Sequence, residues 1–287
     1  MGCSRRQRHM NPWVETAGVA LLAFCGVALG RWFSRLPRPF WTLGYLIPLT
    51  FVLLIGLAYR VRTLEFLPPF SWLMAGRTEF ALTALIGTML LTTPLSRLPL
   101  RRDRMAVAVL MILVVGQVAA WPFLAPAFNR AELSALKTRF DSDGICLQNT
   151  DYTCGAAAAV TGLRRLGLTA QEGDIAMLCH TSSALGTPPD VLCEQLQRRY
   201  SGDGLVCHYR PFSSVAELSQ AGCTLALIRF AFLLDHYVTV LEVGDRTITV
   251  GDPLTGKQTL THEEFARKWR FVGVVLTRRM QGERRKA

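Results

Sequence analysis

One cysteine in the C-terminal half has surroundings suited to nucleophilic chemistry. Cys154 follows the polar stretch Gln148-Asn-Thr-Asp-Tyr-Thr and opens an alanine-rich run that ends at Leu166-Gly167. Small residues of high helix propensity followed by glycine predict a helix of about three turns. A thiol at a helix N-terminus faces unpaired backbone N–H groups and the positive end of the macrodipole, which stabilise a thiolate. We therefore interpret Cys154 as a nucleophile.

A nucleophilic thiol needs a base, a group that orients the base, and donors for an oxyanion. His236 begins a β-branched run and Asp252 ends the next one, and Gly244-Asp245 between them is a hairpin turn signal. Pairing of the two runs would bring His236 and Asp252 together at the open end of the hairpin. Gln148, six residues before Cys154, could donate its side-chain amide beside the Cys154 backbone N–H. The predicted catalytic set is therefore Cys154, His236, Asp252 and Gln148.

These motifs resemble one known family. Residues 148–157, His236-Tyr-Val and Gly251-Asp252-Pro253, in this order, resemble the bacteriocin-processing leader peptidases over roughly residues 145–279. Those are papain-like cysteine peptidases, often fused to the front of ABC exporters, that cut leaders after a Gly-Gly pair. The resemblance implies that Cys154 is the nucleophile, His236 the general base and Asp252 its orienter, with Gln148 in the oxyanion hole.

The sequence departs from that family in three ways. Thr153 precedes the cysteine where exporter-linked members usually have Asp, and no Gly-x4-Gly-Lys-Ser/Thr pattern of an ATPase occurs. The apolar part also precedes the peptidase-like part, the reverse of the exporter order. These departures affect double-glycine specificity more than peptidase activity. Two alternatives stay open: a silent module that binds leader peptides for a separate ABC exporter, or a thiol amidase or acyltransferase acting on another amide.

Composition predicts a membrane protein. Half of the 287 residues are hydrophobic and the mean hydropathy is +0.25. Four apolar segments, each flanked by arginines and aromatic residues, are close to the length that crosses a hydrocarbon core of about 30 Å. Residues 1–130 carry fourteen of the 32 Lys and Arg against four acids, so the net charge of +11 comes almost wholly from loops of this part. That distribution is typical of membrane loops and argues against a nucleic-acid partner.

The charged loops also bear on orientation. Four spans place both chain ends on one side, and the two short loops on the other side carry dense arginines. These are Arg31, Arg35, Arg38, Arg97, Arg101, Arg102 and Arg104. By density the short loops are expected in the cytoplasm, which places the C-terminal domain outside it. We expect a multi-pass protein of a bacterial inner membrane.

The remaining patterns predict an α+β class: a papain-like domain with a helical half and then an antiparallel sheet, preceded by an all-α four-helix transmembrane region. Thr169 and Thr187 are expected to cap short helices, and Thr261 a later one. The predicted organisation is a basic tail (1–13), transmembrane helices (14–124; about 14–30, 40–59, 80–95 and 105–124), a connector (125–144), the peptidase-like domain (145–279) and a basic tail (280–287).

The remaining thiols and imidazoles are assigned no catalytic role. Cys179-His180 and Cys207-His208 lack the paired spacings of a zinc site, so neither a metal nor another cofactor is implied. The other late cysteines are either small core residues or disulfide partners. They are Cys146, Cys179, Cys193, Cys207 and Cys223. The expected partners are a peptide or protein substrate and the lipid bilayer.

Overall fold

The computed structural model describes residues 12–74, 78–231 and 234–279, which form two compact units. The first unit runs to Leu57 and includes Trp72–Phe128; the second contains Ala58–Ser71 and the chain from Asn129 onward. The predicted tail 280–287 lies outside the described residues. So does the predicted tail 1–13, except for its last two residues, which open the first helix.

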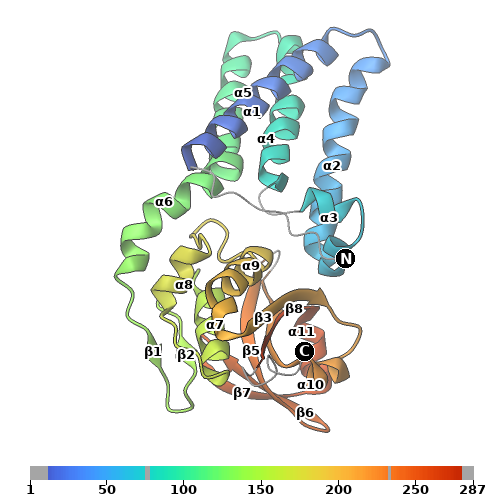
Figure 1. The fold of residues 1–287 in the computed structure, drawn as a ribbon. Helices are drawn as coiled ribbons and strands as arrows, with labels where there is room; N and C mark the ends of the chain where they lie inside the picture. The colour runs from blue at the N-terminus through green and yellow to red at the C-terminus, as the bar shows by residue number, and fades with distance from the viewer. Residues whose placement is uncertain (1–11, 75–77, 232–233, 280–287) are drawn as a thin grey trace. The chain divides into compact units, whose positions relative to one another are not determined.

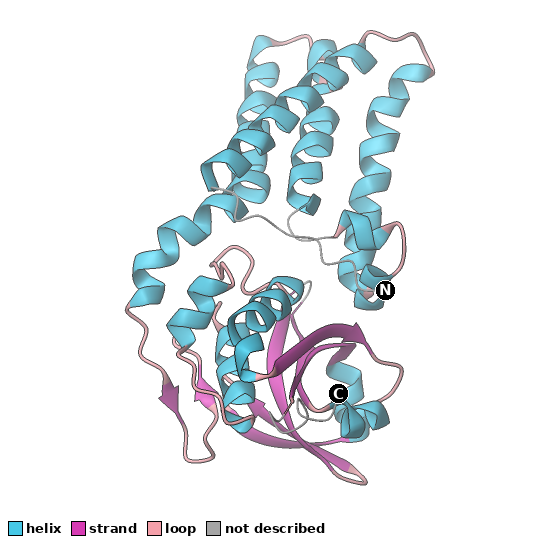
Figure 2. Cartoon of the chain, viewed as in Figure 1, coloured by secondary structure: helices cyan, strands magenta, loops and turns pink. Residues whose placement is uncertain are grey.

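The first unit is helical (Figures 1 and 2). Its principal elements are α1 (Pro12–Ser34), α2 (Leu43–Arg60), α4 (Thr78–Thr92), α5 (Arg101–Val114), the π-helical turn η4 (Val115–Ala120) and α6 (Trp121–Ser134). The apolar run predicted for 105–124 therefore begins earlier and does not end at 124. The π-helical turn joins α5 to α6, and α6 continues to Ser134, through the first half of the stretch expected as a connector.

Helices α1 and α4 approach each other closely because two glycines face α4. A Cβ on Gly26 would lie 2.2 Å from the carbonyl oxygen of Leu85, and one on Gly30 would lie 2.8 Å from that of Met89. Neither distance is compatible with a side chain. A small-x3-small spacing of this kind allows helix backbones to come together in a lipid environment.

Two described helices are long and apolar enough to cross a membrane. They are Thr16–Ser34, with a mean hydropathy of 1.5, and Phe40–Arg60, with 2.0; the apolar helix Glu79–Thr92 is shorter. Large apolar side chains on α1, α2 and α5 are exposed within the unit. They include Leu21, Phe24, Leu46, Leu53, Met105, Ile112 and Leu113.

The second unit contains a six-stranded antiparallel sheet in the order β3-β8-β4-β5-β6-β7. Its strands are β3 (Leu205–Pro211), β4 (Cys223–Ala231), β5 (Leu234–Val243), β6 (Thr247–Asp252), β7 (Gly256–Thr261) and β8 (Trp269–Arg278). A small ladder of β1 (Arg139–Phe140) and β2 (Cys146–Leu147) precedes them. The predicted α+β class, with a helical half followed by an antiparallel sheet, is confirmed.

Two cores hold this unit together. One forms where α7 (Cys154–Arg165), α8 (Glu172–Leu178) and α9 (Pro189–Tyr200) pack on the sheet, with Leu163, Leu196 and Leu225 buried. The other buries Leu218 of α10 (Leu218–Ala221), Phe265 of α11 (His262–Lys268) and Trp269 against further strand residues.

Short elements complete the second unit. They are η2 (Arg62–Phe66), the start of α3 (Phe70–Leu73), η5 (Ser201–Asp203) and η6 (Val215–Glu217). The first unit also contains η1 (Phe40–Thr42) and η3 (Leu95–Arg97).

The helix caps were predicted with mixed success. Thr261 caps α11 in a full capping box with Glu264, as expected. Thr169 does not cap α8, because that helix begins at Glu172 with Gln171 as its N-cap. The N-cap of α9 is Pro188 rather than Thr187. The Thr187 hydroxyl is instead 2.7 Å from that of Thr181, so a tertiary hydrogen bond replaces the expected local one.

Candidate active site

Cys154 is the first residue of α7, and the turn before it is hydrogen-bonded. The Ala157 N–H donates to the Thr153 carbonyl at 3.0 Å, which opens the helix. The Thr150 N–H donates to Thr153 Oγ1 at 3.3 Å. The Gln148 N–H donates to the Pro253 carbonyl at 2.9 Å, so the loop before the helix is tied to the residue that follows β6. Cys154 is consequently held at the edge of the core, with 9% of its surface exposed.

Gly155 allows the first turn of α7 to approach the sheet. A Cβ at this position would lie 2.7 Å from the Thr187 Cβ and 3.1 Å from Tyr237 Cε2. The Tyr237 hydroxyl donates to the Thr187 carbonyl at 2.9 Å. A glycine after the cysteine is thus required by the close contact between α7, the segment before α9, and β5.

The helix of the thiol and the strand of the imidazole are also joined directly. Thr239 on β5 donates its buried hydroxyl to the Ala158 carbonyl on α7 at 2.9 Å. His236 is the third residue of the same strand. The hydrogen bond therefore fixes the separation between the two elements that carry Cys154 and His236.

His236 and Asp252 meet at the end of the β5–β6 hairpin, as the turn signal predicted. His236 Nε2 and Asp252 Oδ1 are 2.7 Å apart, and both residues are buried. The Leu254 N–H donates to the same carboxylate oxygen at 2.8 Å. Because Nε2 faces Asp252, Nδ1 is the ring nitrogen left for Cys154.

The interactions of His236 with Asp252 and Cys154 favour a protonated imidazole beside the thiol. Burial lowers the pKa of His236, but its hydrogen bonds with Asp252 and Cys154 outweigh burial and raise that pKa from 6.5 to about 9. Burial raises the pKa of Asp252, whereas the hydrogen bonds from His236 and from the Leu254 N–H outweigh it and lower that pKa below 3.8. A buried cation next to a thiol stabilises the thiolate form.

Gln148 lies in the same loop but is engaged elsewhere. Its Nε2 donates to the Thr150 carbonyl at 2.7 Å, and its buried Oε1 has no hydrogen-bond partner among the described residues. The second N–H of the Gln148 amide is left to donate to an oxyanion. The structure therefore places Gln148 near the nucleophile along the chain without an interaction between the two side chains.

Sequence reasoning missed two contributors to the site. The Phe230 ring lies over His236, with centroids 5.6 Å apart, and is 60% exposed. The fully buried Glu172 accepts a hydrogen bond from the Asn149 N–H at 2.9 Å and another from the Asn149 side-chain amide. The first contact joins the neighbouring strands β4 and β5, and the second joins the loop before α7 to α8.

The other cysteines of the second unit lie in or against its core. The late cysteines left open as disulfide partners are free, and all but the partly buried Cys223 are buried. Burial raises the pKa of Cys146 to about 12 and that of Cys223 to about 11, so these thiols are protonated at neutral pH. Burial also raises the pKa of Cys179. Within the described ranges, no cluster of three or more His, Cys, Asp or Glu side chains could hold a metal ion.

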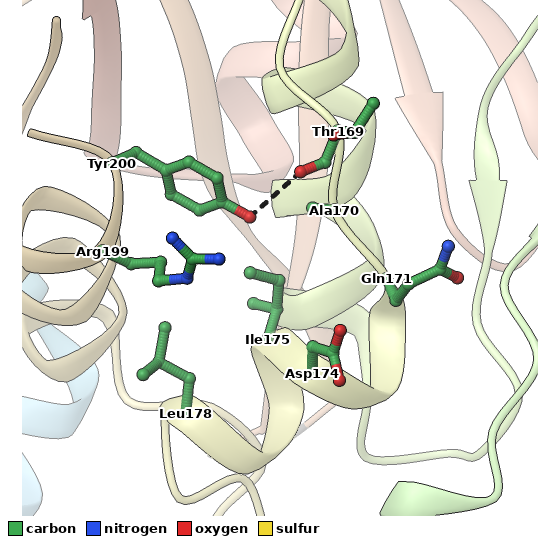
Figure 3. Close-up of a pocket in the computed structure, with 8 residues that line it drawn as sticks. All are labelled: Thr169, Ala170, Gln171, Asp174, Ile175, Leu178, Arg199 and Tyr200. Carbon is green, nitrogen blue, oxygen red and sulfur yellow. Dashed lines mark hydrogen bonds between the residues drawn. The ribbon is translucent and has the colours of Figure 1, made fainter. Parts of the chain in front are cut away.

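A separate pocket of about 410 Å³ lies between α8 and the end of α9 (Figure 3). Ile175 and Leu178 form its apolar wall, and Asp174 and Arg199 supply its charges. The Tyr200 hydroxyl donates to the Thr169 carbonyl at 3.2 Å along its edge. None of the four predicted catalytic residues lines it.

A thiol at a helix start, followed by an imidazole and a carboxylate in series, is the arrangement that cysteine peptidases use. Comparison with known proteins agrees with this class. Residues 143–281 match the Peptidase C39 family, and the resemblance inferred from the motifs is confirmed.

Three individual proteins that this chain resembles share at most 28% of their residues with it. An uncharacterized protein of Methanothermobacter marburgensis is 28% identical over 145 residues, covering 50% of this chain and 94% of that protein. A double glycine motif protease from an AMS/PCAT transporter, solved in complex with the leader peptide, is 16% identical. Its TM-score is 0.40, over 51% of this chain and 96% of that one. The peptidase domain of Streptococcus ComA, a bi-functional ABC transporter, is 17% identical, with a TM-score of 0.40 over 46% and 96%.

Proposed function

We propose that this chain is a membrane-anchored cysteine peptidase that hydrolyses peptide bonds. The observation that carries the proposal is the buried series of Cys154, His236 and Asp252 within a domain of the Peptidase C39 family. Each member has the chemical property that its role requires: a thiol at a helix start, an imidazole of raised pKa, and a carboxylate that keeps its charge when buried.

The reaction follows the order of these groups. The Cys154 thiolate attacks the carbonyl carbon, and the oxyanion that forms accepts hydrogen bonds from the Cys154 N–H and the Gln148 side-chain amide. His236 as imidazolium then donates its proton to the leaving amine, which gives a thioester. Neutral His236 next removes a proton from water, the hydroxide attacks the thioester, and the acid product and the thiol are released.

The first unit has features of a lipid-embedded helical region, and we propose four membrane spans. Large apolar side chains are exposed on α1, α2 and α5, as expected of helices that face lipid. The close approach of α1 and α4 through Gly26 and Gly30 gives further support.

The second unit consists of two chain segments that are separated by residues 72–128, and this separation supports an even number of membrane spans between them. Residues 58–71 and the chain from 129 onward form one compact unit, so both lie on the same side of a bilayer. The intervening residues 72–128 must then cross it an even number of times. Because α4 and α5–α6 are the apolar helices of this stretch, we propose that they form one pair of spans and α1–α2 the other.

We further propose that the peptidase domain lies outside the cytoplasm of a bacterial inner membrane. The arginine-rich loops after α1 and α4 lie at the opposite ends of the proposed spans. A reporter fused to the C-terminus tests this orientation. Alkaline phosphatase activity is expected, and activity of a cytoplasm-specific reporter would reverse the assignment.

The proposed substrates are secreted or membrane-bound peptides, leader-bearing ones among them, delivered by a separate ABC exporter. The family match supports a peptide substrate, and two of the similar solved structures are described as peptidases of transporters. Profiling with leader-type peptides and with cell-wall amides separates peptide hydrolysis from amidase or transfer chemistry.

Alkylation of the full chain in detergent micelles tests the nucleophile. With iodoacetamide at neutral pH, we expect Cys154 to be modified much faster than Cys179, and His236→Ala to remove the difference. His262→Ala is the matched control, because this partly buried imidazole lies at the far turn of the hairpin, with Nε2 2.9 Å from the Gly244 carbonyl oxygen. If Cys154 reacts no faster than the buried thiols, the domain is a silent peptide-binding module.

A further inference from the structure

A segment from the first half of the sequence completes the second unit through a network of charges. Arg62 of η2 donates from Nε to Asp235 Oδ2 at 2.9 Å and pairs through Nη1 with Glu65. Arg270 of β8 donates from Nε to the other oxygen of Asp235 at 2.7 Å. The Tyr209 hydroxyl donates to Glu65 Oε2 at 3.0 Å. The carboxylate of Asp235 is therefore held between two guanidinium groups.

This network is largely excluded from water. The side chains of Arg62, Glu65, Asp235 and Arg270 are 14%, 11%, 9% and 4% exposed. The group contains two positive and two negative charges, so it is balanced only when all four are present. Removing one partner of a buried ion pair leaves an uncompensated charge and costs far more than removing an exposed pair.

Apolar packing holds η2 in the same place. The Phe66 ring lies 5.0 Å from that of Tyr209, and Phe66 packs against the core formed with α7–α9. The guanidinium of Arg62 also lies 4.8 Å from the centre of the Tyr59 ring. The segment around η2 is thus built into this unit as firmly as an ordinary secondary-structure element.

The network ends beside the imidazole. Asp235 immediately precedes His236 at the start of β5. Regular pairing with β4 stops there, since the register shifts between Arg229 and Ala231. Where the ladder is irregular, backbone hydrogen bonds constrain a strand end less. The ion pairs of Asp235 with Arg62 and Arg270 supply an additional constraint on the residue next to His236.

We propose that Arg62 is a positioning residue for His236, acting through Asp235, so that activity depends on the segment between α2 and α4. This inference rests on the proposed function. Arg62 does not touch the reacting atoms; it fixes the end of β5 from which the imidazole extends toward Cys154 and Asp252.

Arg62→Ala in the full chain tests the proposal by two measurements. Cys154 alkylation is expected to slow by about tenfold or more, because small displacements of a catalytic group have large effects on rate. NMR titration of ¹³C-labelled histidines is expected to show a lower pKa for His236, whose signal is assigned with His236→Ala. Arg267→Ala, which breaks an exposed ion pair with Glu263, is the matched control and should change neither measurement.

Labelling of the fully buried Cys179 reports unfolding in the same sample. If Arg62→Ala exposes Cys179, Arg62→Lys replaces it: this variant keeps the charge but loses the fork that reaches both Glu65 and Asp235. Unchanged alkylation and titration in the folded variant would overturn the inference. If wild-type Cys154 is unreactive but the titration of His236 still shifts in the variant, the proposed function fails and the positioning role stands.

Discussion

Asp252→Asn tests the electrostatic basis of the site most directly. The change keeps the shape of the side chain but removes the negative charge 2.7 Å from His236 Nε2. Burial, which opposes a charged imidazole, would then face only the interaction with Cys154. We therefore expect the His236 pKa to fall and the imidazolium–thiolate pair to be less populated at neutral pH.

The magnitude follows from the pKa of His236. Its rise from 6.5 to about 9 corresponds to roughly 3 to 4 kcal/mol, since one pKa unit is worth about 1.4 kcal/mol. Because the folded-state pKa is raised, this stabilisation is complete below pH 6.5 and is lost as the pH rises through about 9. Each increment of about 1.4 kcal/mol of this stabilisation that is lost with the Asp252 charge shifts the equilibrium between the imidazolium–thiolate pair and the neutral pair about tenfold toward the neutral pair.

The assay is the rate of Cys154 alkylation in the full chain as a function of pH. In Asp252→Asn the rate at neutral pH should fall, by at most the factor by which this equilibrium shifts, and the pH profile of the rate should change. The stability difference between wild type and variant should shrink above about pH 9, where the His236 contribution is lost. Asp245→Asn, in the exposed turn of the same hairpin, is the control.

A wild-type rate and pH profile in Asp252→Asn would refute this reasoning. That result would mean that the carboxylate only packs against the imidazole and does not maintain its charge. A loss of rate accompanied by labelling of Cys179 would instead indicate unfolding, so both thiols are followed in each sample.

Three further substitutions have distinct expected outcomes. Gly155→Ala should lower the free energy of unfolding by about 1–3 kcal/mol because the site has no room for a Cβ. Gly202→Ala is the control: a Cβ there meets nothing within 4 Å, and its thermal unfolding should match that of the wild type. Gln148→Ala should reduce peptide hydrolysis by about 10²–10³-fold but leave Cys154 alkylation nearly unchanged, and equal losses in both would exclude an oxyanion role. Thr239→Val removes the hydrogen bond between β5 and α7 and should cost about 1–2 kcal/mol by chemical denaturation; no cost would show that packing alone sets their separation.

Local patterns predicted the elements that carry the site. The alanine-rich run after Cys154 forms a helix over Cys154–Arg165, and two β-branched runs form the β5–β6 hairpin. The pairing of Thr239 with Gly251 then brings Asp252 level with Val238, two residues from His236, so that the two side chains can meet diagonally. These elements can be predicted from the sequence because helix propensity and turn preferences depend on only a few neighbouring residues.

Other elements were missed where local signals were weak or were overridden. Strand β7 consists mostly of polar residues and lacks an apolar strand pattern. Its pairing with β6 depends on the tight turn at Gly256, where φ is +81°. In place of the cap expected at Thr169, α8 begins after Gln171 and its Glu172 N–H donates to Thr138 Oγ1, and Pro188 stands at the N-cap expected for Thr187. In the first unit, α6 continues past the predicted end of its apolar run despite Pro126.

The sequence by itself determined which residues could react: a thiol, an imidazole and a carboxylate, in an order and spacing typical of one family. Only the tertiary structure decided what holds them. The contact of Asn149 with Glu172 and the ion pair of Arg62 with Asp235 join segments that no repeat or turn relates. Buried polar groups need hydrogen-bond partners, and tertiary packing supplies those partners from distant parts of the chain: Arg62 and Asp235 are 173 residues apart.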